Sequence, residues 1–179
     1  MWMMWEIKRI QDVITFQRMF EVIGKIGIKG KFKIKSFRAG TQKFLRETEW
    51  NENLVVFNTT SGLNLVMEAL LGSGTLSLEV SKAKLGTGST AAADANTDLQ
   101  TATVDNIIIA TEDITATNKI TLTFFAPDAD VPNGTYNEVG IFVDSVDPRL
   151  FARAIISPAF TKATNEDSQI EYTLTFDNT

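Results

Sequence analysis

Apolar and polar residues alternate along much of the chain after residue 75, as they do in strands that bury one face. The alternation is clearest near the C-terminus, where the apolar positions are Ile170, Tyr172, Leu174 and Phe176. Strands are predicted over 75–85, 103–111, 119–125, 136–143, 150–157 and 169–176. Such a series of short strands, separated by polar turns, predicts a mainly β fold, and we expect an antiparallel β-sandwich.

A β-hairpin is predicted ahead of this series. Over 31–38, Phe32 and Ile34 alternate with lysines, and 42–49 reads as the returning strand. Ala39-Gly40 supplies the turn between them. The predicted β domain therefore begins near residue 31.

One or two short helices are expected in the N-terminal third. Apolar residues over 6–23 recur mostly at offsets of three, four and seven, which favours an amphipathic helix, although part of this stretch also fits a strand. A second helix is predicted over about 62–71. Thr60 or Ser61 is its expected N-cap, and Gly72 or Gly74 its expected stop.

Composition excludes several classes of function. The chain has 179 residues, 44% of them hydrophobic, which suits one domain with a buried core. It has no cysteine and no histidine, so thiolate chemistry, the commonest general base and the commonest zinc ligand are absent. We therefore expect a protein that is not an enzyme, with no catalytic residue, no cofactor and no metal ligand.

Charge is divided unevenly along the chain. Residues 1–50 hold eleven Lys and Arg against five Asp and Glu, whereas residues 51–179 hold six against seventeen. The net charge of −5 disfavours nucleic acid as a partner. The lysines at 29, 31, 33 and 35 suit docking to another protein and suit a solvated strand face equally well.

The N-terminal segment is the second candidate for docking. Its aromatic residues, Trp2, Trp5, Phe16 and Phe20, suggest burial in a neighbouring protein, together with the basic residues Lys29, Lys31 and Lys33. We expect residues 1–30 to form a helical or extended docking segment, and residues 31–179 to form the β domain. The segment resembles no signal peptide and no stretch is long enough to span a membrane, so we expect synthesis in a host cytoplasm and no membrane partner.

A long polar loop, 86–101, is the third candidate site. Gly86 and Gly88 resemble a phosphate loop only superficially, because no lysine follows them, so a tight turn is the better interpretation. Asp94 and Asp98 are potential oxygen ligands for a cation, but turn chemistry is favoured over metal binding. We expect this loop to contact another subunit or a receptor.

Glu138 is the carboxylate closest to a catalytic pattern. It precedes Gly140 on a predicted strand, and no second carboxylate is placed to complete a glycosidase pair. Glu138 is interpreted as an exposed or a salt-bridged strand residue, and Arg153, on a nearby predicted strand, is the candidate partner. Glu138, Gly140 and Arg153 are therefore assigned structural roles.

The order of these features resembles small β-rich structural proteins of tailed-bacteriophage virions. The segments that carry the resemblance are 53–56, 70–72, 84–88, 98–99, 137–142, 150–154 and 160–162. The resemblance implies a non-enzymatic subunit of a tail, baseplate, neck or fibre, which assembles with copies of itself and with other virion proteins. Its expected location is the virion.

Three alternatives remain at this stage. A carbohydrate-binding or adhesin-type module needs an exposed aromatic platform, for which Tyr136 and Phe142 are the candidates, and its partner is a host-surface glycan or receptor. A capsid-decoration protein differs from the main hypothesis only in its position on the particle. An enzyme requires a deep pocket with a second carboxylate near Glu138.

Overall fold

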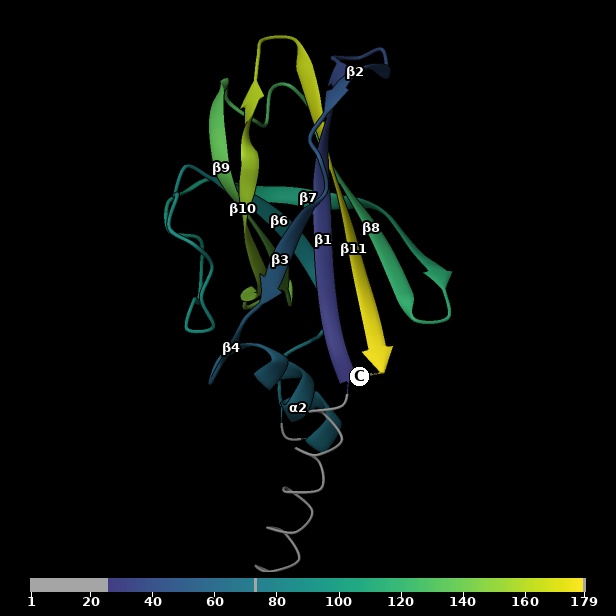
Figure 1. Ribbon diagram of the computed structural model, residues 1–179, viewed down its shortest axis with the longest axis vertical. Helices are drawn as coiled ribbons and strands as arrows, with labels where there is room; N and C mark the ends of the chain where they lie inside the picture. The colour runs from purple at the N-terminus through teal and green to yellow at the C-terminus, as the bar shows by residue number, and fades with distance from the viewer. Residues whose placement is uncertain (1–25, 73, 179) are drawn as a thin grey trace, which may run out of the picture.

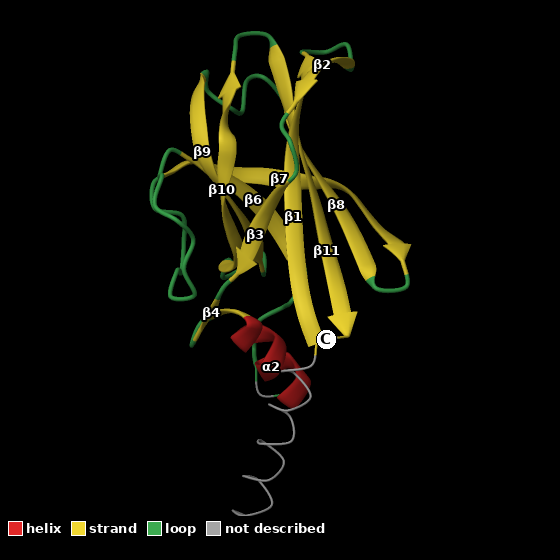
Figure 2. Ribbon diagram, viewed as in Figure 1, coloured by secondary structure: helices red, strands yellow, loops and turns green. Residues whose placement is uncertain are grey.

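The computed structural model describes residues 26–72 and 74–178. This part of the chain is mainly β and all of its strand pairings are antiparallel, which confirms the predicted fold class at that level. The described residues contain a single helix, α2 (Leu63–Leu71), shown in red in Figure 2. The helix predicted over 6–23 lies outside the described residues.

The strands follow one another with short connections. In chain order they are β1 (Ile26–Arg38), β2 (Lys43–Glu47), β3 (Asn51–Val55), β4 (Phe57–Asn58), β5 (Ser61–Gly62), β6 (Val80–Gly86), β7 (Ala102–Ala116), β8 (Lys119–Ala126), β9 (Gly134–Val143), β10 (Arg149–Lys162) and β11 (Glu166–Asn178). The predicted hairpin is confirmed as β1 and β2, with Gly40 in a left-handed turn conformation. The five strands predicted after residue 100 correspond to β7 to β11.

Eight of the described strands close into a barrel. Their order is β11-β8-β7-β6-β9-β10-β3-β1, and β1 returns to β11 in a register that runs from Ile26↔Asn178 to Arg38↔Glu166. β2 adds to β1 beyond β3, and β4 pairs only with β5 (Figure 1). We expected two packed sheets, but the β1–β11 pairing joins the strands into one closed sheet. The alternation of apolar and polar residues does not distinguish a β-sandwich from a β-barrel, because strands in both bury every second residue.

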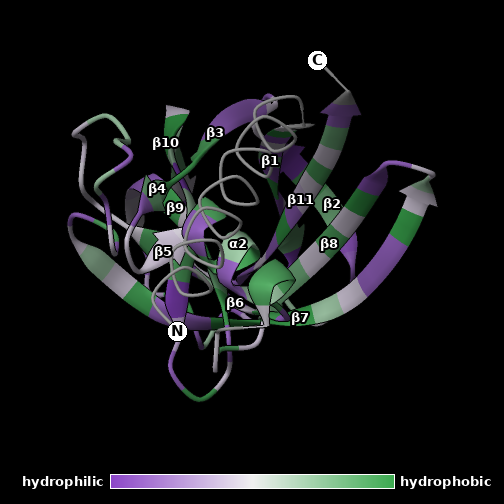
Figure 3. Ribbon diagram, turned by 90° about the horizontal axis from the view of Figure 1, so that it is seen from below, coloured by the Kyte–Doolittle hydropathy of each residue, from purple (hydrophilic) through white to green (hydrophobic). Residues whose placement is uncertain are grey.

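The core fills the inside of the barrel. Phe32 and Ile34 of β1 point inward and are fully buried, whereas the lysines between them lie outside. β8 and β11 repeat this alternation, which appears in Figure 3 as bands of opposite hydropathy along both strands. Tyr172, the centre of the strand predicted near the C-terminus, is 1% exposed. The apolar face predicted for the last strand is therefore confirmed at Ile170, Tyr172 and Leu174, whereas Phe176 is exposed.

The helix is placed correctly, but its predicted N-cap is wrong. Gly62 caps it with a φ of 60°, and no side chain contributes a capping hydrogen bond. Ser61 instead pairs within the β4–β5 ribbon, and the N–H of Leu63 donates to the carbonyl of Val56 at 3.0 Å. Gly72, one of the two glycines expected to stop the helix, ends it in the left-handed conformation.

The strand predicted over 75–85 is only half correct, because β6 begins at Val80. The preceding residues bend around Asp144, whose carboxylate accepts the N–H of Ser77 at 2.7 Å. The carbonyl of Glu79 accepts the N–H of Asp144 at 2.9 Å. These contacts to the β9–β10 turn take up backbone groups that a strand would use for pairing.

Candidate functional site

The loop between β6 and β7, residues 87–101, runs over the outside of β9 and β10 without strand or helix structure (Figure 1). Beneath it, Glu138 of β9 faces Arg153 of β10. The side chains of this pair are 0% and 1% exposed, and Nη2 of Arg153 lies 2.7 Å from Oε2 of Glu138. Nε of Arg153 donates to the same oxygen at 2.9 Å. The salt bridge expected from the sequence is therefore confirmed, and it is fully buried.

The carboxylate of Glu138 holds both ends of the loop. Oε1 accepts the N–H of Gly88 at 3.0 Å and that of Thr101 at 2.7 Å, while Oε2 accepts the N–H of Gln100 at 3.0 Å. Charged acceptors of this kind make stronger hydrogen bonds than neutral ones. Glu138 therefore joins the start and the finish of the loop to the barrel wall.

Arg153 holds the middle of the loop. Nη2 donates to the carbonyl of Thr90 at 2.9 Å, and Nη1 donates to the carbonyl of Ala91 at 3.3 Å and to Oδ1 of Asn96 at 3.0 Å. With the two bonds to Glu138, all five N–H donors of the guanidinium have an acceptor. The loop is thus fixed along its length by one buried ion pair.

Three glycines make room for this arrangement. A Cβ on Gly86 would lie 2.6 Å from Oε1 of Glu138, and a Cβ on Gly88 would come closer still to the same oxygen. A Cβ on Gly140 would lie 2.8 Å from the side chain of Leu99, which is buried under the loop. The structure therefore brings together Gly86, Gly88, Glu138, Gly140 and Arg153, which the sequence had placed in two separate groups.

The protonation of Glu138 reflects these contacts. Burial is the largest influence and opposes ionisation. The hydrogen bonds from Thr101, Gln100 and Arg153 together outweigh it and hold the pKa of Glu138 below its ordinary value. The carboxyl group of Glu138 is therefore ionised at neutral pH.

The aspartates of the loop also have structural contacts. Asp98 and Asp105 both bind Nζ of Lys84, at 3.1 Å and 2.7 Å. The carbonyl of Asp94 accepts hydrogen bonds from Asn58 and from the backbone of Phe57, while its residue is exposed. Over the described ranges, no group of three or more carboxylates is placed to hold a metal ion.

The basic docking candidates lie along the outer face of β1. Lys29 pairs with Asp177 at 2.9 Å and Lys33 with Glu47 at 3.2 Å. Lys31 and Lys33 also lie over the ring of Trp50, 4.7 Å and 4.9 Å from its centroid. The aromatic candidates, Trp2, Trp5, Phe16 and Phe20, lie outside the described residues.

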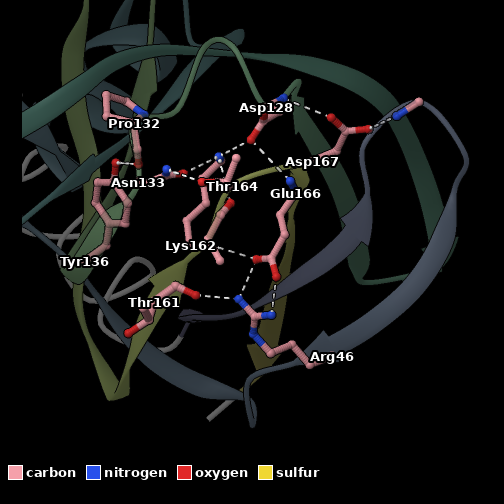
Figure 4. Close-up of polar contacts among 12 residues, drawn as sticks. Arg46, Asp128, Pro132, Asn133, Tyr136, Thr161, Lys162, Thr164, Glu166 and Asp167 are labelled. Carbon is pink, nitrogen blue, oxygen red and sulfur yellow. Dashed lines mark hydrogen bonds and ion pairs between the residues drawn. The ribbon is translucent and has the colours of Figure 1, made fainter.

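A second polar cluster, missed by the sequence analysis, lies at the end of the barrel opposite α2 (Figures 1 and 4). Lys162, whose side chain is 0% exposed, binds Asp128 at 2.5 Å. Arg46 of β2 binds Glu166 of β11 through both terminal nitrogens and donates to the carbonyl of Thr161. The hydrogen bond from Arg46 is the largest influence in holding the pKa of Glu166 below its ordinary value. No local motif signals this cluster, because its members come from four separate segments.

The aromatic platform required by the carbohydrate-binding alternative is not formed by its two candidates. Tyr136 is 3% exposed, and its hydroxyl donates to the carbonyl of Pro132 at 2.6 Å. Phe142 is 1% exposed and lies under Nζ of Lys84, which is 4.3 Å from its ring centroid. Both side chains therefore contribute to the fold and not to a surface.

Comparison with known proteins identifies no relative of the chain. The chain matches no protein-family model, no curated protein and no solved structure. In the described residues, no helix combines the length and apolarity needed to span a membrane.

Proposed function

We propose that this chain is a non-enzymatic structural subunit of a tailed-phage virion, which assembles with copies of itself and docks to other virion proteins. The observation that carries the proposal is the loop 87–101, whose backbone is fixed to the barrel by the buried pair of Glu138 and Arg153. A loop held in one shape loses little conformational entropy when it binds, so it makes an efficient contact surface.

The same pair argues against the enzymatic alternative. A general acid or base needs a carboxylate oxygen that can reach a substrate. Both oxygens of Glu138 accept hydrogen bonds from the loop backbone, and Arg153 occupies the remaining direction. In this proposal Glu138 is a structural residue.

Docking to the particle is assigned to the N-terminal segment and to the lysines of β1, with the virion as the location of the mature protein. The test is a Trp2→Ala, Trp5→Ala double variant, which should fold normally, as judged by its thermal unfolding, but fail to enter particles in a complementation assay. Incorporation of the variant at the wild-type level would contradict the docking role of these residues.

Self-assembly is tested by the mass of the full chain in solution. Light scattering at two concentrations should give a discrete oligomer, or growth into larger particles as the concentration rises. A mass of 19.8 kDa at both concentrations would contradict self-assembly. Electron microscopy of labelled particles locates the subunit on the particle. The same experiment tests the capsid-decoration alternative.

A further inference from the structure

Half of one edge of β7 is free of strand pairing. β6 pairs with β7 only as far as Lys82↔Ile108. From Ile109 to Ala116, β7 pairs with β8 on one side and with no described strand on the other. The β7–β8 hairpin reaches away from the barrel in Figure 1. A strand edge of this kind presents unpaired N–H and C=O groups that another strand can bind.

A groove runs along this edge. It has a volume of about 510 Å³ and is lined by the start of β6, by residues 108–112 of β7 and by Ser145. Apolar side chains flank it: Ile108 is 59% exposed, and Ile114, further along the edge, is 75% exposed. Exposed large apolar residues beside an unpaired edge are typical of a protein contact site.

The edge is acidic. Glu112 and Asp113 are adjacent on β7, and Glu79 lines the groove opposite them. All three are exposed, and the described residues offer them no salt bridge within 4.0 Å. The surface therefore favours a partner that is basic as well as extended.

The β1–β2 hairpin is basic at its tip. Arg38 and Lys43 are directly opposite each other, both are exposed, and neither forms a salt bridge with a described residue. Like charges in directly opposed positions destabilise a strand pair. The acid nearest to Arg38 across the sheet, Glu166, is already bound by Arg46. An external acidic partner would relieve this repulsion.

The hairpin also carries exposed apolar residues and an edge of its own. Every residue of β2 is exposed, including Phe44 at 53% and Leu45 at 37%. β2 pairs with β1 alone among the described strands. It therefore offers the extended, basic and partly apolar segment that the β7 edge would bind.

We propose that β2 of one copy of the chain pairs with the free edge of β7 of a second copy, which brings the basic hairpin that carries Arg38 and Lys43 against the acidic edge that carries Glu112 and Asp113. This inference rests on the proposed function and names the surface through which the subunit assembles. Pairing β7 with β7 would oppose acid to acid, and pairing hairpin with hairpin would oppose base to base, so charge favours the unlike pair. Such a contact is head-to-tail, and it produces rings or filaments.

The test uses charge reversal on the full chain. We expect Arg38→Glu, Lys43→Glu and, separately, Glu112→Lys, Asp113→Lys to weaken self-association about tenfold or more, measured by sedimentation equilibrium, because each places like charges at the contact. Raising the salt concentration should weaken wild-type association in the same assay. Circular dichroism and thermal unfolding verify that each variant is folded.

Recombining the variants gives the decisive result. Each double variant presents two edges of the same sign, so neither self-associates, but mixing them restores opposite charges at every contact. The mixture should therefore assemble, and so should the quadruple variant alone. Glu52→Lys, Asp130→Lys is the matched control for Glu112→Lys, Asp113→Lys: it changes the net charge by the same amount at exposed positions outside both edges and should assemble like the wild type.

A cross-link supplies a second readout that does not depend on charge. Because the chain contains no cysteine, Lys43→Cys and Asp113→Cys chains each carry one thiol, and mixing them under oxidising conditions should give a disulfide dimer. Neither cysteine variant alone should form a disulfide dimer as fast as the mixture does.

The outcomes separate the two proposals. A wild-type chain that assembles, with reversed variants that assemble equally well or a mixture that stays dissociated, overturns the β2–β7 pairing and leaves the structural-subunit proposal standing. A wild-type chain that stays monomeric at every concentration overturns both.

Discussion

The buried pair of Glu138 and Arg153 is maintained by its hydrogen bonds more than by its opposite charges. Removing two ions from water costs about as much as their attraction returns, so a buried pair contributes little beyond an apolar pair of similar volume. Removing one partner is different, because the other charge then stays buried without compensation. At this position the remaining arginine would also keep only its contacts to the loop.

Glu138→Gln should therefore lower the free energy of unfolding by about 3–5 kcal/mol, measured by urea denaturation. The control is Lys29→Met, which breaks an exposed pair with Asp177 and should cost about 1 kcal/mol or less. Equal losses for Glu138→Gln and Lys29→Met would show that burial of the pair is unimportant.

Two inward-facing serines, unlike the buried ion pair, have no hydrogen-bond partners. Ser36 of β1 and Ser168 of β11 are direct register partners, both are buried, and neither hydroxyl has a hydrogen-bond partner. Changing both to alanine removes two unsatisfied polar groups, so we expect the free energy of unfolding to rise by about 1 kcal/mol or more. A fall in thermal unfolding temperature would contradict this.

At the scale of elements, the loop 87–101 shows which features the sequence patterns predict and which they do not. Alternation located β8 and β11 and their buried faces, and the spacing of Glu138 and Arg153 suggested their salt bridge. The contacts of that pair with the loop could not be predicted, because they are made to backbone atoms whose positions depend on the closed sheet. Arg46 and Lys162 escaped notice for the same reason: the β1–β11 closure brings Glu166 near Arg46, and the β8–β11 pairing brings Asp128 near Lys162.

A substitution at Gly88 tests whether the carboxylate of Glu138 holds the loop in place. A methyl group there would collide with the carboxylate of Glu138, so Gly88→Ala should destabilise the protein by about 1–3 kcal/mol and speed amide hydrogen exchange at Gln100 and Thr101. Gly134→Ala is the matched control, because a Cβ at Gly134 meets no atom within 4 Å. Unchanged exchange in Gly88→Ala would mean that the loop is held by other contacts.

At the scale of the whole molecule, buried and bridged carboxylates link stability to pH. The pKa values of Glu138 and Glu166 lie below their ordinary value of 4.5. The unfolded chain therefore binds protons more readily than the folded protein as the pH falls below that value, and stability is lost there. Well above it both states are ionised and this contribution is fully present.

We accordingly expect the urea midpoint to be level between about pH 6 and 8, where the absence of histidine leaves no side chain of ordinary pKa to titrate, and to fall steeply below about pH 4.5. Glu166→Gln should reduce the slope of that fall. A midpoint that rises on acidification would contradict the depressed pKa values.

The pairing of β1 with β11 has a further consequence during synthesis. The first described strand finds its partner in the last one, so the ring stays open until Asn178 has left the ribosome. Until then the edge of β1 that pairs with β11 stays exposed together with its apolar face, and contacts between such distant segments form slowly. The nascent chain should therefore be a substrate for chaperones, and assembly with other copies should be a strictly post-translational event.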